Sequence, residues 1–484
     1  MTISLTFEIG NSLAKNFSEL EEEVCGLTRS IGQEIIRIVL ETLDSVILAE
    51  RDTQRYRCKG FRKTCAKTML GNVEYKRRVY EDTAAAEGVH CVYLLDNELN
   101  MNKVGLASAN VCRLAASSIC ESSYRKTAEL ITNSTGLSIS HQGIWRIIQE
   151  LGEKQERLVE RHTELAGENK GVGEIATKIL YEEDDGVWLN LQRKSRQENG
   201  PSKEMKVGIA YDGVRCEKTG SGERRILDNK VAYASFESAG EFRKSKEGLV
   251  ASRYDVDEIE LRVHNGDGAN WIRRPNTENS IDVLDEFHRD KKITECVRDP
   301  EFAALLRNLL DGKKIDMLLD CIEAQINSLT DAAEKEKLRE LQHYYTENKD
   351  SLLDYRDRGI PIPETREPGV IHHARLGSME SNIFTLIGNR MKGGRANWSI
   401  DGANHLALLL CQKCTIGFEN LFAKLPPIPE KEPEWVDPLP LMGAGSVPAR
   451  EGHGFEYPDK LSISETDGWL NSFLKALASK PNNF

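Results

Sequence analysis

Three acidic residues, far apart in the chain, lie beside small residues at points where strands or helices are expected to end or begin. Asp185 precedes Gly186, Asp267 lies in Asn-Gly-Asp-Gly, and Glu380 lies in Gly-Ser-Met-Glu-Ser-Asn. Strand ends and helix starts of an α/β sheet project side chains into a shared cleft. Converging carboxylates repel one another unless divalent cations join them, and Mg²⁺ prefers oxygen ligands. Two ions roughly 3.5–4 Å apart could activate an attacking hydroxyl and stabilise the leaving oxygen of a phosphodiester.

Each acid taken alone has a plainer explanation. The run Glu182–Asp185 could be a solvated loop, and Asn-Gly-Asp-Gly could be a simple turn. Glu380, at a helix start, could merely complement the helix dipole. The placement of all three acids in matching sheet order favours the joint site.

The elements that must position these acids are typical of an α/β core. KILYEED, GVWLNLQ and MKVGIAY are strand-like runs, separated by Asp185-Gly186 and by the polar loop QRKSRQENGPSKE. A helical stretch, SAGEFRKSKEGLVASRY, and a further strand, EIELRVHNGD, follow. Three antiparallel strands, a helix and another strand are the order of a ribonuclease H-like core.

Residues 289–357 are almost wholly helical in pattern and predict an insertion into this core. Apolar side chains recur at helical spacing, with a cap expected at Thr330 or Asp331 between two helices. The two stripes are Ile315, Leu318, Leu319, Ile322 and Ile326, and then Leu338, Leu341 and Tyr345.

The segment 51–78 is strongly basic. It carries ten basic and two acidic residues, a local net charge of +8. Alternation on both sides of Gly71-Asn72 predicts a β-hairpin, and such a basic ribbon suits a phosphate backbone better than it suits a merely solvated surface. The candidate DNA-binding residues here are Arg55, Arg57, Lys59, Arg62, Lys63, Lys67, Arg77 and Arg78, with Arg51 and Lys76 completing the basic set.

Residues before and after the hairpin are expected to be helical. The first fifty residues repeat apolar positions near the 3.6 period, and residues 97–165 contain a helix-turn-helix pattern around Gly136. The second helix would be capped by Ser138 or Ser140 and would bury Ile144, Ile147 and Ile148. It would offer His141, Gln142 and Arg146 to a DNA groove, although many helix pairs with this spacing bind nothing.

The composition bounds the remaining possibilities. The 484 residues suggest two or three domains, and 39% hydrophobic with 29% charged residues describes a soluble globular protein. No membrane-length apolar run and no signal peptide are expected, which favours a cytoplasmic location. The net charge of −12 argues against nucleic-acid binding only if the charge is evenly spread, which it is not. Eleven scattered cysteines suit reduced thiols, and Cys411 and Cys414 favour helix packing over a metal site.

Several ordered motifs resemble the DDE transposases of bacterial insertion sequences, specifically the ISLre-two-type family, relatives of the mutator-like transposases. The similar segments are RKTCAKTMLGNVEYKRRVYED, VYLLDNELNM, YEEDDGVWLNLQ, HNGDGANWI, IDVLDEFHRDKKI and GSMESNIFTLIGNRMKGGRANWSIDGANHLALL. Together they span nearly the whole chain. The resemblance implies a DNA transposase with a ribonuclease H-like catalytic core and a mainly helical N-terminal DNA-binding region.

The resemblance also implies roles for individual residues. Asp185, Asp267 and Glu380 would be the catalytic, metal-binding triad, with Asp184 open as an alternative first acid. The cofactor would be Mg²⁺ or Mn²⁺, in a two-ion site. Asp285 and His288 match a D-x-x-H motif with a supporting role, or a packed helix start. A basic turn beyond the catalytic helix would grip DNA through Arg390, Lys392, Arg395 and Trp398.

The expected partners are the terminal inverted repeats of the element and the target DNA, bound by a homodimer or higher oligomer. The expected divisions are 1–95 (helix and basic hairpin), 96–166 (helix-turn-helix-like), 175–288 and 359–425 (core), 289–358 (insertion) and 426–484 (Pro-rich tail). Two alternatives stay open: a stand-alone ribonuclease H-like nuclease, and a domesticated, non-catalytic DNA-binding protein.

Overall fold

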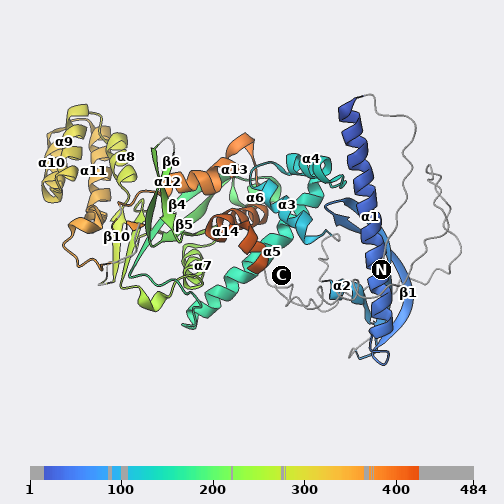
Figure 1. The fold of residues 1–484 in the computed structure, drawn as a ribbon. Coiled ribbons are helices and arrows are strands. Elements are labelled where there is room, and N and C mark those ends of the chain that lie inside the picture. The colour runs from blue at the N-terminus through green and yellow to red at the C-terminus, as the bar shows by residue number, and fades with distance from the viewer. Residues whose placement is uncertain are drawn as a thin grey trace. The chain divides into compact units, whose positions relative to one another are not determined.

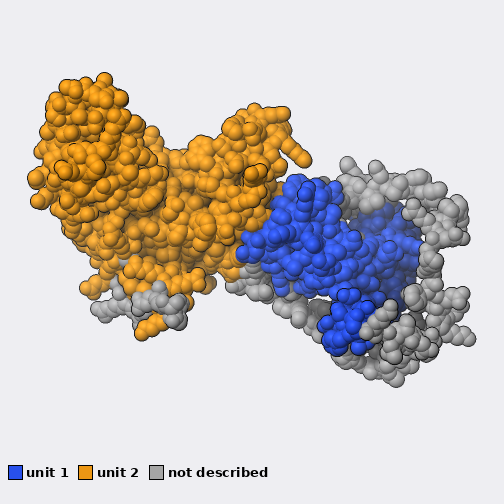
Figure 2. Space-filling view, turned by 90° about the horizontal axis from the view of Figure 1, so that it is seen from above, with its two compact units in different colours: residues 1–147, 422–484 blue, residues 148–421 orange. Residues whose placement is uncertain are grey.

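The structure, a computed structural model, describes residues 16–84, 90–99, 107–219, 222–273, 277, 279–364, 370–371, 373 and 375–424. The chain forms two compact units, residues 1–147 with 422–484 (unit 1) and residues 148–421 (unit 2) (Figure 2). The division falls inside helix α5 (His141–Gly167), upstream of the boundary that the sequence suggested between 96–166 and 175–288. The Pro-rich tail, 426–484, lies outside the described residues.

Unit 1 contains the predicted hairpin and the long N-terminal helix. Strands β1 (Tyr56–Thr68), β2 (Gly71–Asp82) and β3 (His90–Val92) form an antiparallel sheet in that order, and α1 spans Phe17–Glu50 (Figure 1). The chain reverses at Met69-Leu70, and Gly71 opens β2 with a φ of +107°. Strand β3 pairs only with the last residues of β2, Tyr80–Asp82; before them, Glu41 and Asp44 of α1 accept the backbone N–H groups of Lys76 and Arg78 at 3.0 and 3.1 Å.

The remaining helices of unit 1 include the predicted helix-turn-helix. Short α2 (Leu94–Glu98) and α3 (Ala109–Ile119) lead to α4 (Tyr124–Thr135), which ends at Gly136 in the left-handed conformation. The Ser140 hydroxyl caps α5 by accepting the N–H of Gly143 at 3.2 Å. Ile144, Ile147 and Ile148 are buried as predicted.

Unit 2 is built on a five-stranded mixed sheet with the order β10-β9-β4-β5-β8. The strands are β4 (Ile179–Asn190), β5 (Ser202–Tyr211), β8 (Val231–Ser235), β9 (Leu261–Gly266) and β10 (Ser280–Leu284). Strand β5 is antiparallel to both β4 and β8, whereas β9 runs parallel to β4 and β10 parallel to β9.

Two local predictions for this sheet were wrong, and two of its strands were missed. The Asp185-Gly186 step does not separate two strands, because β4 keeps its ladder with β5 through Asn190. What ends at this step is the pairing of β4 with β9 on its opposite edge. Strand β9 ends at Gly266, opposite Asp184, so Asp185 is the first residue of β4 that extends past β9. The expected loop after β4 contains helix α6 (Arg193–Asn199), and strands β8 and β10 were not predicted.

Helices cover one face of the sheet, and the insertion lies at the end of unit 2 marked by α9 and α10 (Figure 1). Phe242 of α7 (Ala239–Ala251) and Leu408 of α14 (Ile400–Lys424) join a core with Leu180, Ala210 and Tyr233 of the sheet. The insertion contains α8 (Glu286–Cys296), α9 (Pro300–Asp311), α10 (Ile315–Ser328) and α11 (Ala332–Glu347). Its two predicted stripes are buried except for the partly buried Leu319, and Asp331 caps α11 as predicted.

A second, smaller sheet in unit 2 was not predicted. Strands β6 (Gly213–Thr219) and β7 (Gly222–Asp228) form a hairpin between β5 and β8, and β11 (Val370–Ile371) pairs with β6. Among the described helices of either unit, none is both long and apolar enough to cross a membrane.

Candidate active site

The three acids of the predicted triad lie on three different elements of unit 2. Asp185 is on β4, is 9% exposed, and its Oδ1 accepts the N–H of Gly186 at 2.6 Å. Asp267 directly follows β9, and its Oδ1 accepts the N–H of Ala269 at 2.7 Å. Glu380 is an exposed residue of α12 (Met379–Ile383), which continues into a π-helical turn (Phe384–Gly388) and α13 (Asn389–Met391).

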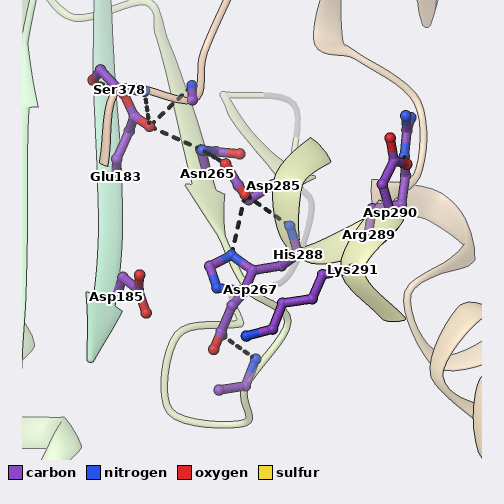
Figure 3. Close-up of polar contacts among 12 residues, drawn as sticks. Glu183, Asp185, Asn265, Asp267, Asp285, His288, Arg289, Asp290, Lys291 and Ser378 are labelled. Carbon is purple, nitrogen blue, oxygen red and sulfur yellow. Dashed lines mark hydrogen bonds and ion pairs between the residues drawn. The ribbon is translucent and has the colours of Figure 1, made fainter. Parts of the chain in front are cut away.

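The pKa of Asp185 is affected by its burial and by the charges of the other two acids. The pKa of Asp185 is raised to about 6, chiefly by burial and further by the charges of Asp267 and Glu380. The hydrogen bond from Gly186 and the nearby His288 act in the opposite direction. Figure 3 shows Asp185 and Asp267 on neighbouring elements of the same site. The carboxyl of Asp185 therefore senses two acids that are remote in the sequence.

The donor set suits a hard divalent cation in its chemistry. All three side chains offer oxygen ligands, and Asp185 and Asp267 each have one oxygen fixed by a backbone N–H. Within the described ranges, however, no three His, Cys, Asp or Glu side chains are already grouped around one ion position. Mg²⁺ does not need such a protein cage, because it keeps waters and substrate phosphates as ligands beside one or two carboxylates. The residues therefore fit Mg²⁺ or Mn²⁺.

Asp184, the alternative first acid, lies on the opposite face of β4. Its carboxylate accepts hydrogen bonds from Lys246 Nζ at 2.6 and 2.8 Å and contacts His264 Nε2 at 2.8 Å. Gly208 makes this possible, because a Cβ there would lie 2.2 Å from Asp184 Oδ1. The side chain of Asp184 is thus held in a buried ion-pair network, away from Asp267 and Glu380, whereas Asp185 is the residue that faces them.

The D-x-x-H pair lies at the same site and also starts helix α8. Asp285 caps α8 through the N–H of His288 at 3.1 Å, and its Oδ1 also contacts His288 Nδ1 at 3.1 Å (Figure 3). The hydrogen bond with Asp285 raises the pKa of His288, burial opposes this, and the charges of Asp185 and Asp267 add to it. Burial works against ionisation of Asp285, but hydrogen bonds from His288 and Asn265 lower its pKa overall. This geometry is compatible with both roles suggested for Asp285 and His288, the start of helix α8 and the support of the candidate site.

Two groups of supporting contacts were not predicted. Tyr344 of the insertion donates its hydroxyl to the backbone carbonyl of Asp267 at 2.8 Å, and Arg273 donates to the carbonyl of Gly268 at 3.2 Å. Glu183 of β4 lies against the start of α12, where the backbone N–H of Ser378 donates to it at 3.0 Å (Figure 3). The only sequence signal for Tyr344 was its place beside an apolar stripe, and Glu183 was not distinguishable from the three acids around it.

The structure reassigns part of the predicted DNA-binding hairpin. Arg77 is buried, forms an ion pair with Asp96, and stacks on Tyr93 with its guanidinium carbon 3.7 Å from the ring centroid. Arg78 forms an ion pair with the buried Asp44 at 2.6 Å. Both arginines attach β2 to helices of unit 1, so the structure favours a structural role for them over the predicted DNA contact.

The other hairpin cations remain candidates in unit 1. Arg55 and Lys59 form surface ion pairs with Asp82 and Glu81, at 2.9 and 2.6 Å. Lys63 and Lys76 face each other across the strands and are exposed. Arg57 and Arg62 are exposed, Lys67 is partly buried, and Gln142 and Arg146 on the second helix of the helix-turn-helix are exposed, as DNA contact would require.

The basic turn beyond α12 is corrected at one residue. Trp398 is 7% exposed, donates its indole N–H to the carbonyl of Met391 at 2.9 Å, and forms a β-bridge with Leu191, directly after β4, so the structure favours packing over the predicted DNA contact. Arg390 lies over its ring, with the guanidinium carbon 5.4 Å from the centroid. Lys392 and Arg395 are exposed and stay candidates.

The Cys-x-x-Cys pair lies within α14, as predicted. Cys411 is buried and Cys414 is exposed, and both are free thiols. Burial raises the pKa of the Cys411 thiol. Packing therefore accounts for Cys411.

Unit 2 thus defines an α/β protein whose mixed sheet and a facing helix bring acidic side chains to one site. The chain belongs to the Uncharacterised protein family (UPF0236), which it matches over residues 11–415. It is 25% identical over 401 residues to a UPF0236 protein of Caldanaerobacter subterraneus subsp. tengcongensis, covering 81% of this chain and 77% of that protein, whose name joins eleven loci of that organism. It is 24% identical to the UPF0236 protein in the vanSb 3′ region of Streptococcus gallolyticus, covering 84% of this chain and 86% of that protein.

Proposed function

We propose that this protein is the DNA transposase of a bacterial insertion sequence, with Asp185, Asp267 and Glu380 as its metal-binding acids. The observation that carries the proposal is the place of these acids: β9 ends opposite Asp184, so that Asp267 follows beside Asp185, and the charges of Asp267 and Glu380 add to the burial that raises the pKa of Asp185 to about 6. Carboxylates that face one another in this way are costly unless a cation joins them, and such perturbed groups cluster at functional sites.

The order of elements in unit 2 supports the proposal. Three antiparallel strands (β4, β5, β8), then helix α7, then β9 parallel to β4, agree with the element order of a ribonuclease H-like core, although β4 unites two of the strands that the sequence predicted and β8 was not predicted. The acids lie on β4, directly after β9, and on α12. In α/β sheets, side chains at the carboxyl ends of strands form the common location of active sites.

The relatives give a second, independent line of support. One relative from Caldanaerobacter subterraneus carries a single name for eleven loci, and another relative from the same organism carries a name that joins four loci. Repeated copies of one gene in a genome are what a mobile element produces. We infer that the present chain is also encoded by a mobile element, because it belongs to the same family and matches most of the length of these proteins.

In the proposed reaction, side chains of this protein bind the divalent ions and the DNA and hold them in position. The free oxygens of Asp185 and Asp267, together with Glu380, would bind two divalent ions, and their backbone hydrogen bonds hold the two aspartates in fixed orientations. When bound, the ions would supply positive charge for an attacking hydroxyl and for the leaving 3′-oxygen of a phosphodiester. Lys392 and Arg395 would contact the strand being cut, while the exposed hairpin cations of unit 1 would bind the terminal repeats.

The proposed setting follows from the substrate. The protein would act on the chromosome in the cytoplasm, and two copies would hold the two ends of one element. Water would first cleave the element end, and the free 3′-hydroxyl would then attack a target phosphodiester in line, without a covalent protein–DNA intermediate.

The experiment uses the full chain and DNA that carries the two flanks of its gene, where terminal inverted repeats are expected. Asp267→Asn and Glu380→Gln should abolish Mg²⁺-dependent strand cleavage, while gel-shift binding to the ends persists. Cleavage retained by both variants would refute the triad.

A strand-transfer assay separates the alternatives. Joining of a 3′-end to a target plasmid supports the transposase. Cleavage without joining would indicate the nuclease, and end binding without cleavage would indicate a domesticated DNA-binding protein.

A further inference from the structure

Glu183 is a fully buried carboxylate that accepts hydrogen bonds from three separate parts of unit 2. Tyr211 of β5 donates its hydroxyl at 2.8 Å, and Asn265 of β9 donates its side-chain N–H at 3.0 Å. From the start of α12, the backbone N–H groups of Gly377 and Ser378 donate at 3.1 and 3.0 Å, and the Ser378 hydroxyl donates as well (Figure 3). Burial raises the pKa of Tyr211 well above its ordinary value, so this hydroxyl remains a donor.

The cluster has a regular relation to the triad. Glu183, Asn265 and Ser378 each lie two residues before one of the three acids, Asp185, Asp267 and Glu380, in the sequence. Residues i and i+2 share one face of a strand, so Glu183 and Asp185 point to the same side of β4. The hydrogen bonds made by Glu183 therefore join the three segments that carry the acids, immediately next to the acids themselves.

The cluster also reaches the D-x-x-H motif. The side-chain N–H₂ group of Asn265 donates to Glu183 Oε2 and, at 3.2 Å, to Asp285 Oδ2. Asp285 in turn contacts His288, which senses the charges of Asp185 and Asp267. One buried carboxylate is thus connected to every segment of the candidate site.

A purely structural ion pair does not account for Glu183. Its neighbour Glu182 is equally buried but lies on the other face of β4, where it pairs with Lys246 at 2.9 Å and with Arg262 at 3.2 Å. Among the described residues, Glu183 has no such cation within ion-pair distance, and its five donors come from hydroxyl, amide and backbone groups. Orphan N–H groups at a helix start favour a negative charge, so Glu183 fixes where α12 begins.

We propose that Glu183 is a positioning residue that sets the separation between Asp185 and Glu380, and thereby the affinity of the site for divalent cations. The part of this inference that concerns metal affinity rests on the proposed function, because it is measured through DNA cleavage. Supporting groups of this kind commonly change metal affinity or activity by roughly 10–100-fold when they are removed. Glu183 itself would contact neither ion nor DNA.

The test compares Glu183→Ala with Glu182→Ala in the full-length chain. Both changes remove a fully buried carboxylate from adjacent positions of β4, so both should lower the stability of unit 2. Only Glu183→Ala should speed hydrogen exchange of the α12 amides (residues 379–383), by about tenfold or more, and raise the Mn²⁺ concentration needed for half-maximal cleavage to a similar degree. Glu183→Gln should recover most of both effects, because its amide oxygen can still accept the three N–H donors while the hydroxyls of Tyr211 and Ser378 turn to accept.

A gentler pair keeps the test decisive if Glu183→Ala does not fold. Ser378→Ala and Tyr211→Phe each remove one hydroxyl donor to Glu183, but only Ser378 belongs to the start of α12. Ser378→Ala should increase α12 exchange and the Mn²⁺ requirement by about fivefold, as expected for one lost hydrogen bond, and Tyr211→Phe should change both less.

Equal α12 exchange and an equal Mn²⁺ requirement within each pair would overturn the proposal. If the wild-type protein cleaves no DNA at any Mn²⁺ concentration, the proposed function is overturned instead. The hydrogen-exchange measurement would still decide whether Glu183 positions α12.

Discussion

The basic hairpin of unit 1 and the acidic segment of β4 in unit 2 are both crowded with like charges, and both divide those charges between two uses. In the hairpin, Arg77 is buried on one face, where it pairs with Asp96, whereas Lys63 and Lys76 are exposed on the other face. In β4, Asp184 is held by Lys246 and His264 on one face, whereas Asp185 faces the other acids. The two regions have opposite charge but the same arrangement.

The comparison shows that the direction of a side chain, more than local charge density, decides what a charged residue does. In a strand, neighbouring residues point to opposite faces, so a continuous charged run is split by the fold. One half must then be neutralised inside the protein, because buried charges are costly unless they are paired. The other half is left for a ligand: phosphate in the hairpin and divalent cations at β4, according to our proposal.

The largest expected effect separates Asp185 from Asp184. Asp185→Asn should lower cleavage by about 10³-fold or more, because it removes a charge that faces the reacting centre. Asp184→Asn should mainly destabilise unit 2, by about 3–5 kcal/mol, because Lys246 and His264 lose a buried partner. Cleavage rates measured beside denaturant unfolding curves check both. A stable Asp184→Asn protein without cleavage, beside an active Asp185→Asn protein, would reverse the assignment.

The next effect compares a cation held in an ion pair with an exposed cation on the same face of β2. Arg78→Gln should destabilise unit 1 by about 3–5 kcal/mol, since it leaves Asp44 buried without its ion-pair partner. Lys76→Gln, two residues earlier on an exposed position, should change the free energy of unfolding by no more than about 0.5 kcal/mol. Thermal unfolding of the two variants provides the measurement, and similar losses in both would show that Lys76 is also structural.

A smaller effect concerns the pH dependence of the metal-free protein. The folded-state pKa of Asp185, about 6, lies above its ordinary value of 3.8, so the native state holds this proton more tightly than the unfolded state does. The associated stability is complete below pH 4 and is lost as the pH rises through 6, to a total of up to about 3 kcal/mol.

Asp185→Asn stays neutral and should remove this part of the pH dependence. Its free energy of unfolding, measured with EDTA, should exceed that of the wild-type protein at pH 7.5 but not at pH 4. A constant difference between the two proteins across this range would contradict the raised pKa.

The sequence predicted the elements with strong local signals and missed those defined by distant partners. The hairpin, the helix-turn-helix and the helical insertion were predictable because turn residues and 3.6-residue periods are local. Strands β8 and β10 have five residues each and are buried among distant neighbours, so they show no clean alternation. The choice between Asp184 and Asp185 depended on Lys246, a partner that no spacing rule connects to β4.

The most subtle prediction concerns the salt dependence of binding to the element ends. Each phosphate that a lysine or arginine neutralises contributes about −0.9 to the slope of log K against log salt for duplex DNA. Removal of such a contact therefore makes the slope less steep by about 0.9. Lys63→Gln with Lys76→Gln, an exposed cross-strand pair, should therefore reduce the slope by about 2 while leaving the fold intact. Arg77→Gln should leave the slope unchanged in whatever fraction of the protein stays folded, because its guanidinium is buried against Tyr93 and Asp96. Fluorescence anisotropy with end DNA at several salt concentrations measures both slopes. A reduced slope for Arg77→Gln, with none for the lysine pair, would mean that DNA binds the opposite face of the hairpin and that the division of charge between its faces has been assigned the wrong way round.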